Sequence, residues 1–272
     1  MTAVLTVIGA GGMGRAIARR LGSGKTVLLA DYNEQTLATL AESLSAEGHH
    51  VESHPVDVSS PESVRTLAKY AASLGSVTQV AHTAGLSPAQ ATAQAILAVD
   101  LLGVTLVLHE FGEVIAPGGA GVVIASMAGH LFPPLTAEQD AALAHTPAHE
   151  LLQLDFVSQL DNPGIAYAIA KQANHIRVRA ASTQWGRRGA RINSISPGII
   201  STPMGQQELA SPVGDGMRSM IAMSGTGRMG TPDDIAAATA FLLGPDATYI
   251  TGTDLLVDGG VVAAAKAGSP TT

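Results

Sequence analysis

The sequence contains no cysteine and few aromatic or charged residues. Without cysteine, the chain has neither a disulfide framework nor a thiolate metal site, so nothing in it suggests secretion. The net charge of -7 argues against a nucleic-acid-binding surface. No apolar run reaches the length of a membrane span, and the first strand segment begins by Val4, which leaves no room for a signal peptide. We therefore expect a cytoplasmic protein that binds neither nucleic acid nor a membrane.

Glycine and apolar residues are abundant instead, with 30 glycines and 46% hydrophobic residues, which is typical of helices packed tightly on a sheet. Short apolar segments alternate with helical segments along the chain. The segments that predict strands are residues 3–8, 26–30, 50–56, 77–82, 121–125, 190–195 and 255–257. Repeated strand-helix units of this kind predict an α/β fold, a Rossmann-type doubly wound parallel sheet. We expect a single domain over residues 1–265 and a flexible tail over 266–272.

The first predicted strand runs directly into a glycine-rich loop. Gly9, Gly11 and Gly14 are separated by Ala10 and by the pair Gly12-Met13. This spacing allows a tight turn, lets the backbone approach a pyrophosphate, and places the phosphates at the N-terminus of the next helix. The alternative is a glycine-rich turn that binds no ligand.

Acidic residues follow the second and third predicted strands. Asp31 can accept hydrogen bonds from the adenine ribose hydroxyls and would repel a 2′-phosphate, which favours NAD over NADP. Residues 32–34 contain no basic side chain, which supports this preference. Asp31 could instead be a solvated strand end. Asp57, followed by Val58, could meet the adenine edge or cap a helix ahead of Pro61.

Tyr167 and Lys171 stand four residues apart on a helical segment, so their side chains share one face. Lowering a tyrosine pKa from about 10 to about 7 requires roughly 4 kcal/mol of extra stabilisation of the phenolate. A nearby lysine cation together with an oxidised nicotinamide can supply that amount. The same spacing also occurs by chance on solvent-facing helices.

Taken in order along the chain, these motifs resemble the short-chain dehydrogenase/reductase family over nearly the whole length. The matching segments are the glycine loop, Asp31, Asp57-Val58, His82-Thr83-Ala84-Gly85, Ser126, Tyr167-x3-Lys171, Pro197-Gly198 and Val257-Asp258-Gly259-Gly260. The resemblance implies that Ser126 holds the substrate oxygen, Tyr167 transfers its proton, and Lys171 binds the nicotinamide ribose. It further implies that Ala84, Gly85, Pro197 and Gly198 adjoin the cofactor, and that the Ile200 backbone and the Thr202 hydroxyl contact the nicotinamide carboxamide.

The sequence departs from the family pattern in three segments. The glycine loop is one residue shorter than usual and has Ile8 in place of threonine, although backbone amides can still bind phosphate. His82 replaces an asparagine, and we expect it to be a packed histidine at a strand end rather than a catalyst. Asp100 stands where relatives have the asparagine of a proton relay. An ionised Asp100 near Lys171 would stabilise the ammonium and raise the tyrosine pKa.

The stretch between Ser126 and Tyr167 is longer than in most relatives and predicts a helical insertion over about 129–165. Thr136 and Gln139 form a predicted capping box. Thr146 is the predicted N-cap of a second helix, with Pro147 in its first turn and one apolar face along it. This face could pack on the protein's own body, form a lid over the substrate, or make an oligomer contact. The layout resembles the 3α-hydroxysteroid dehydrogenase/carbonyl reductase subgroup, in which the insertion accompanies a dimer.

We therefore predict an NAD(H)-dependent oxidoreductase that interconverts a secondary alcohol and a ketone and assembles as a homo-oligomer, either a dimer or a tetramer. Its substrate is predicted to be hydrophobic and of small to medium size, steroid-like or another carbonyl compound, because apolar residues cluster in the segments expected to wall the cleft. These residues are Leu131, Phe132, Pro133, Pro134, Leu135, Met204, Met217, Met220 and Met223. The alternatives are an NAD-binding regulatory protein with little turnover and an epimerase or lyase on the same fold. No metal site is expected, since the cluster of His49, His50 and His54 has no acidic or thiol partner at ligand spacing.

Overall fold

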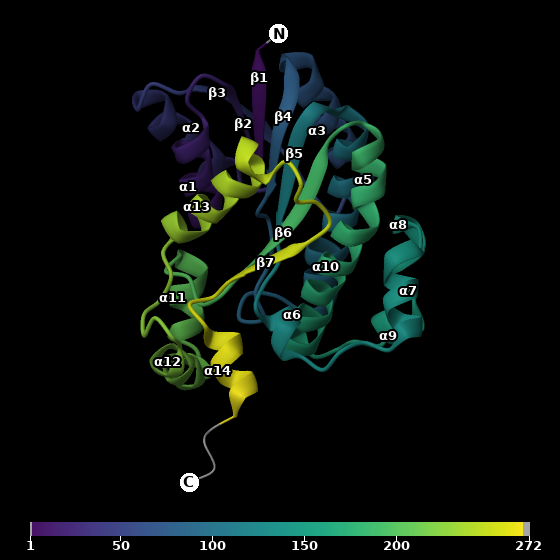
Figure 1. Ribbon diagram of the computed structural model, residues 1–272, viewed down its shortest axis with the longest axis vertical. Helices are drawn as coiled ribbons and strands as arrows, with labels where there is room; N and C mark the ends of the chain where they lie inside the picture. The colour runs from purple at the N-terminus through teal and green to yellow at the C-terminus, as the bar shows by residue number, and fades with distance from the viewer. Residues whose placement is uncertain (1, 269–272) are drawn as a thin grey trace.

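Seven parallel strands form a single sheet in the computed structural model, which describes residues 2–268 (Figure 1). The strands are β1 (Ala3–Ile8), β2 (Thr26–Asp31), β3 (His50–Pro55), β4 (Ser76–His82), β5 (Ile115–Ile124), β6 (Arg191–Pro197) and β7 (Asp254–Val257). Their order is β3-β2-β1-β4-β5-β6-β7, and every neighbouring pair is parallel. The seven predicted strands and the α/β class are confirmed, although β5 begins earlier than expected.

Helices cover both faces of the sheet because its central strands are apolar on both faces. In β1, for example, Val4, Leu5, Val7 and Ile8 are all fully buried. One face is covered by α3 (Pro61–Leu74), α5 (Val104–Val114) and α10 (Pro163–Arg187), and the other by α1 (Gly12–Leu21), α2 (Glu34–Ala46) and α13 (Pro232–Leu243) (Figure 1). The remaining helices after the insertion are α11 (Pro203–Leu209), α12 (Gly214–Met223), the 3₁₀ turn η2 (Pro245–Ala247) and α14 (Val261–Ala267).

One helix is longer and more apolar than the sequence analysis allowed. The segments α4 (Ala93–Ile96), η1 (Leu97–Gly103) and α5 run on as one helix, Ala93–Val114, and η1 is a π-helix. By length and composition alone these 22 residues could cross a membrane, but 67% of the apolar window is buried inside the protein. This degree of burial is typical of a core helix, and a core helix can be as long and as apolar as a membrane span.

The insertion consists of four short helices, α6 (Ala128–Leu131), α7 (Ala137–His145), α8 (Ala148–Leu151) and α9 (Asp155–Ser158). The predicted capping box is confirmed, because the side chains of Thr136 and Gln139 each accept a hydrogen bond from the backbone N–H of the other residue. The predicted cap at Thr146 is wrong. Pro147 occupies the cap position of α8, and the Thr146 carbonyl instead accepts a hydrogen bond of 2.7 Å from Arg177. The expected second helix is also broken by a turn between α8 and α9.

The apolar face of the insertion packs on the protein's own body. Leu143, Leu151 and Val157 are fully buried in a cluster with Leu97 and Leu101 of the long helix and with α10. The first of the three alternatives for this face therefore describes its packing, since these side chains are already covered within one chain.

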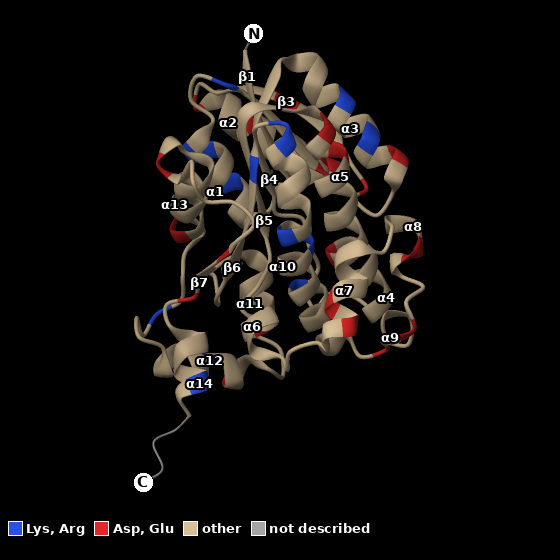
Figure 2. Ribbon diagram, turned by 45° about the vertical axis from the view of Figure 1, so that its right-hand side comes forward, with Lys and Arg blue, Asp and Glu red and all other residues tan. Residues whose placement is uncertain are grey.

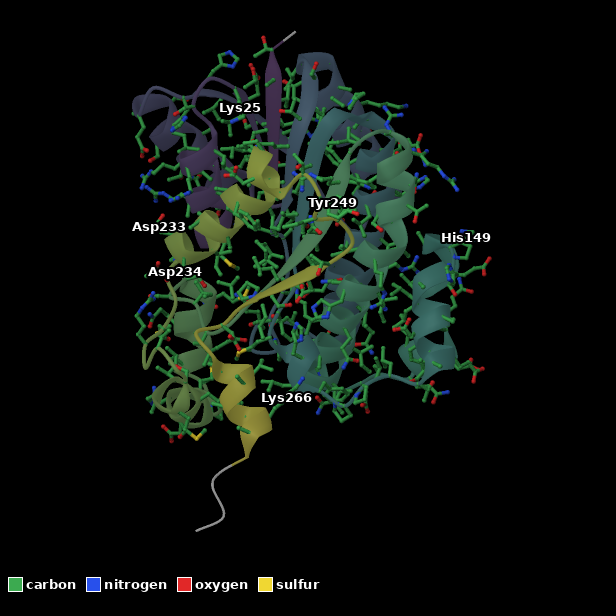
Figure 3. The ribbon with its side chains drawn as sticks, viewed as in Figure 1. Lys25, His149, Asp233, Asp234, Tyr249 and Lys266 are labelled. Atoms are coloured by element: carbon green, nitrogen blue, oxygen red, sulfur yellow. The ribbon has the colours of Figure 1, made fainter. Side chains whose placement is uncertain are left out.

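The C-terminal boundary differs slightly from the expected one. Lys266 and Ala267, which were assigned to the tail, form the last turn of α14 (Figures 1 and 3). Residues 269–272 of the predicted tail, like Met1, lie outside the described residues. Charged residues of both signs lie on the outer helices, for example on α3 (Figure 2).

His82 ends β4 with a side chain only 1% exposed, so the prediction of a packed strand-end histidine is confirmed. Burial lowers the pKa of this imidazole from 6.5 to about 3, the Lys171 charge adds to the effect, and the Ile8 carbonyl opposes it. Between a pH of about 3 and 6.5, the unfolded chain therefore binds a proton on His82 that the folded chain does not bind. Because the pKa of His82 is lower in the folded protein, keeping its imidazole neutral costs no unfolding free energy at high pH. The cost grows as the pH falls below 6.5.

We expect His82→Asn to reduce the acid sensitivity of folding. Lowering the pH from 7 to 5 should cost the native protein about 2 kcal/mol of unfolding free energy through His82 alone. Urea unfolding of both proteins at the two pH values measures this difference. His109→Asn, a change at an exposed position of α5, serves as the control. Equal losses in the native protein and in His82→Asn would contradict the assignment.

Candidate active site

A cleft of about 600 Å³ opens at the carboxyl ends of β1 and β4, where the strand order reverses direction. In open α/β sheets ligands bind at this switch point. The lining residues predicted to bind a cofactor are Gly9, Gly11, Gly12, Met13, Gly14, Asp31, Asp57, Val58, Ala84, Gly85 and Thr202. The fold thus brings together segments that lie up to 193 positions apart in the sequence at one edge of the sheet.

The glycine loop leaves no space for side chains where it packs. Gly9 has a φ of +103°, and a Cβ there would lie 2.5 Å from the Ala84 nitrogen. A Cβ on Gly14 would collide with the Gly9 carbonyl, and one on Gly12 would lie 2.9 Å from Thr202 Cγ2. Gly11 faces open space and caps α1 without a side-chain hydrogen bond. The α1 N-terminus is therefore accessible to a phosphate at Gly11, and the shortened loop fits a dinucleotide.

Asp31 lies in this cleft at the end of β2. Its Oδ2 accepts a hydrogen bond of 2.6 Å from Ala10 N–H, and its Oδ1 accepts one of 2.8 Å from Asn33 N–H. These bonds fix the carboxylate and leave lone pairs for ribose hydroxyls. The nearby Arg15 points to α2, where its Nη2 lies 3.3 Å from Ser43 Oγ.

Asp57 also lines the cleft and does not cap a helix. Ser60 occupies the cap position of α3 and accepts from Ser63 N–H, whereas Asp57 Oδ1 accepts from the Ser59 hydroxyl at 2.6 Å. Of the two alternatives for Asp57, the helix cap is therefore wrong. The adenine contact remains a prediction.

Tyr167 and Lys171 project from one face of α10, which begins at the Asn162 cap and Pro163. The Lys171 Nζ lies 5.3 Å from the centre of the Tyr167 ring. Ser126 follows β5, and its Oγ accepts a hydrogen bond of 3.1 Å from Ala128 N–H. The Ser126 hydroxyl lies close enough to Tyr167 to stabilise the phenolate. The three predicted catalytic side chains are thus brought together.

Asp100 forms a buried ion pair with Lys171. Its Oδ2 lies 3.2 Å from Lys171 Nζ, and the two side chains are 0% and 5% exposed. Its Oδ1 accepts a hydrogen bond of 2.8 Å from Leu86 N–H, and Lys171 Nζ also donates to the Ile124 carbonyl at 3.4 Å. A Cβ on Gly85 would lie 3.4 Å from both the Asp100 carboxylate and Lys171 Nζ, so the pair adjoins the cleft.

These contacts shift the pKa of each group in the site. Burial raises the pKa of Asp100, and the opposing effects of Lys171 and Leu86 N–H are weaker. Burial lowers the pKa of Lys171, but Asp100 and Tyr167 outweigh it, so that the pKa rises. Burial is also the largest cause of the raised pKa of Tyr167, where Asp100 adds to the rise while Lys171 and Ser126 oppose it. In the protein without a bound dinucleotide, Lys171 alone therefore does not bring the tyrosine pKa down.

The main-chain carbonyl of Asp100 has its own partner. With its nitrogen turned toward the helix, the Asn174 amide donates to the Asp100 carbonyl at 2.8 Å and to the Ala170 carbonyl at 3.0 Å. The π-helical turn η1 holds this carbonyl in place, and such turns recur at functional sites.

The predicted nicotinamide segment follows β6. Thr202 caps α11 by accepting from Gly205 N–H at 3.1 Å and packs against Gly12. Gly198 and Ile200 line a neighbouring cavity of about 220 Å³ rather than the main cleft. Pro197 accepts a hydrogen bond of 2.9 Å from Met127 N–H, which ties this strand end to the segment after Ser126.

Three polar residues near the cleft were missed by the sequence analysis. Gln90 donates a hydrogen bond of 2.9 Å to Gln207 of α11. Burial raises the pKa of Glu208, the Ser87 hydroxyl opposes that rise, and the Glu208 charge acts on Tyr167. Their sequence positions offer no signal, because the contacts of Gln90 with Gln207 and of Ser87 with Glu208 join segments more than 100 residues apart.

The predicted apolar wall is only partly assembled. Met204 lines the cleft, as does Leu86, which the sequence analysis did not single out. Leu135 instead packs in the cluster beneath the insertion, and Met223 is 59% exposed. Apolar side chains thus line the cleft, and the Glu208 carboxylate acts on Tyr167 by its charge.

Two family profiles match the chain. One, described as short chain dehydrogenase, matches residues 3–138, and the other, described as Enoyl-(Acyl carrier protein) reductase, matches residues 151–262. Residues 139–150, between the two matched ranges, fall within the helical insertion.

Individual proteins align over most of the chain. A protein from Alternaria brassicicola named "Short-chain dehydrogenase/reductase bsc3" is 42% identical over 267 residues, which covers 95% of each chain. A "3-alpha-hydroxysteroid dehydrogenase/carbonyl reductase" from Comamonas testosteroni is 32% identical over 184 residues, 65% of this chain and 70% of that protein. A solved structure of an actinorhodin polyketide ketoreductase variant with NADPH superposes with a TM-score of 0.75 at 23% identity, covering 96% and 97% of the two chains.

The likeness to the solved structure supports the fold, whereas the 42% identity over nearly the full length supports common descent. Both agree with the site, since the glycine loop lines the cleft at the switch point of the sheet and Lys171 adjoins the same cleft at Gly85. The chain therefore belongs to the short-chain dehydrogenase/reductase family.

Proposed function

We propose that the protein is an NAD(H)-dependent oxidoreductase that interconverts a secondary alcohol and a ketone. The observation that carries this proposal is the grouping of Ser126, Tyr167 and Lys171 beside a cleft shaped for a dinucleotide. The names of the relatives, which include dehydrogenases and reductases, support oxidoreductase chemistry in general. A regulatory protein without turnover would have no need of a phenol and an ammonium placed in this way.

In this proposal a bound NAD supplies the hydride acceptor. The Tyr167 oxygen would take the hydroxyl proton of the alcohol as the carbon of the alcohol loses hydride. The Ser126 hydroxyl would donate a hydrogen bond to the substrate oxygen. Lys171 favours the phenolate by its charge and is available to the nicotinamide ribose. In the reverse direction Tyr167 returns the proton to the alkoxide that forms from the ketone.

The substrate is proposed to be a hydrophobic compound of small to medium size with one polar group. Leu86 and Met204 offer apolar contact in the cleft, and Glu208 acts electrostatically on Tyr167 from α11. The similarity to the enzyme named for 3α-hydroxysteroids supports a steroid-like or other carbonyl compound. An epimerase or lyase on the same fold would turn over without net formation of NADH.

We expect Tyr167→Phe to abolish turnover, because phenylalanine has no oxygen that can take the substrate proton. Oxidation of a panel of hydrophobic secondary alcohols, followed as NADH formation, should fall by at least about a hundredfold, the usual contribution of a general acid or base. NADH binding by fluorescence should be nearly unchanged, and it serves as the folding control. Retained turnover would rule out the mechanism, and binding without turnover in the native protein would favour a regulator.

NAD is proposed as the cofactor because of the fixed Asp31 carboxylate. We expect Asp31→Asn to change the ratio of kcat/KM for NAD over that for NADP by at least about tenfold toward NADP, which corresponds to about 1.4 kcal/mol of lost repulsion. Glu34→Gln, which removes an exposed carboxylate nearby, should leave the ratio almost unchanged. A native protein that prefers NADP would contradict the proposal.

Asp100 is proposed as a positioning residue that sets the tyrosine pKa. Its negative charge raises the pKa of Tyr167, so Asp100→Asn should lower that pKa. Because alcohol oxidation uses the phenolate, the rise of kcat/KM with pH should move to lower pH in this variant. Glu208→Gln should move it in the same direction by a smaller amount, since Glu208 is the weaker of the two influences. A move to higher pH would instead show that Asp100 acts mainly by keeping Lys171 charged.

A further inference from the structure

Two histidines and an aspartate meet beside the catalytic helix at a place that the proposed reaction does not use. His130 belongs to α6, His175 to α10 one turn beyond Lys171, and Asp254 begins β7. The His130 Nε2 lies 2.8 Å from Asp254 Oδ2, and the His175 Nε2 lies 3.5 Å from Asp254 Oδ1. The centres of the two imidazole rings are 4.7 Å apart.

We propose that His130, His175 and Asp254 form a site for a divalent transition-metal ion, with Zn²⁺ as the best-fitting ion. One ligand atom from each residue lies within 4.8 Å of the other two. Imidazole nitrogen and carboxylate oxygen are ligands that zinc prefers when no thiolate is present. Three protein ligands leave the fourth position of a tetrahedral ion for water.

The distances agree with zinc coordination after small side-chain movements. Tetrahedral ligands about 2.0–2.1 Å from zinc stand roughly 3.3 Å from one another. The contacts of Asp254 with the two histidines, 2.8 and 3.5 Å, lie on either side of this value. The side chains of His130, His175 and Asp254 are 26%, 16% and 11% exposed, so an ion can reach them from solvent.

One serine on β6 orients a ligand of the proposed site. The Ser194 hydroxyl donates to Asp254 Oδ1 at 2.6 Å, and hydrogen bonds of this kind hold metal ligands in place in known sites. The Ser196 hydroxyl lies 2.8 Å from His175 Nε2, the nitrogen offered to the ion. A bound ion would replace the contact of His175 with Ser196 and would tie α6, α10 and β7 together.

The sequence analysis missed this site because its ligands have no motif spacing. His130 and Asp254 are 124 residues apart, and only the parallel arrangement of β6 and β7 brings them together. The three neighbouring histidines His49, His50 and His54, which did attract attention, are not part of it.

Titration of the metal-free protein with Co²⁺ and competition by Zn²⁺ test the proposal. We expect one equivalent of Co²⁺ to give the visible absorption of a tetrahedral site, and Zn²⁺ to displace it and raise the Tm. His130→Gln, His175→Gln and Asp254→Asn should each weaken binding by at least roughly tenfold. The native protein decides the question by itself, because the absence of this absorption together with an unchanged Tm in Zn²⁺ would overturn the proposal.

His149→Gln provides a matched control. His149 also has a carboxylate partner, Glu150 at 3.1 Å, but its side chain is 78% exposed at the outer edge of α8, far from β7 (Figure 3). Binding should be unchanged in this variant. Weaker binding in His149→Gln, with full binding in the three cluster variants, would place the ion at the surface and would also overturn the proposal. Circular dichroism confirms the folding of each variant, and His130→Gln alters the most exposed of the three ligands.

Discussion

The buried ion pair between Lys171 and Asp100 is the constraint on which the rest of the site depends. Removing two charges from water costs several kcal/mol for each ion, and their attraction offsets this cost only when the geometry and the remaining hydrogen bonds are good. Here the Leu86 N–H and the Ile124 carbonyl complete the shell of the pair. Three chain segments, from the ends of β4 and β5 and from the π-helical turn η1, must therefore meet α10 at one point.

The same pair explains why the tyrosine alone is not a ready base. The Lys171 charge is paired with the Asp100 carboxylate, whose own charge acts on Tyr167 in the opposite direction. Burial together with Asp100 keeps the Tyr167 pKa above its ordinary value. A positive charge in the cleft acts in the opposite direction. Under the proposed function, oxidised cofactor is thus the partner that completes the base, which would confine proton abstraction to the loaded enzyme.

Local patterns were sufficient to predict the strands and the glycine loop, because apolar alternation and positive-φ turns are properties of neighbouring residues. The grouping of Ser126, Tyr167 and Lys171 followed from a resemblance, and the structure brings them together. Features set by distant contacts were not predictable in this way. The Thr146 carbonyl beside the start of α8 binds Arg177, 31 residues away, and the cluster around Asp254 depends on the pairing of β6 with β7.

The burial of the insertion changes which segment can control access to Tyr167. Leu143, Leu151 and Val157 already contact α10 and the long helix, so moving the insertion away would expose a large apolar surface at a cost of roughly 1.5–3 kcal/mol for each side chain. The α11 segment is held across the cleft by the hydrogen bond between Gln90 and Gln207, by the interaction of Glu208 with the Ser87 hydroxyl, and by the contacts of Thr202. A neutral hydrogen bond contributes only about 0.5–1.5 kcal/mol. Each of these polar contacts of α11 is thus weaker than the burial of one apolar side chain of the insertion, and α11 carries Glu208, whose charge acts on Tyr167.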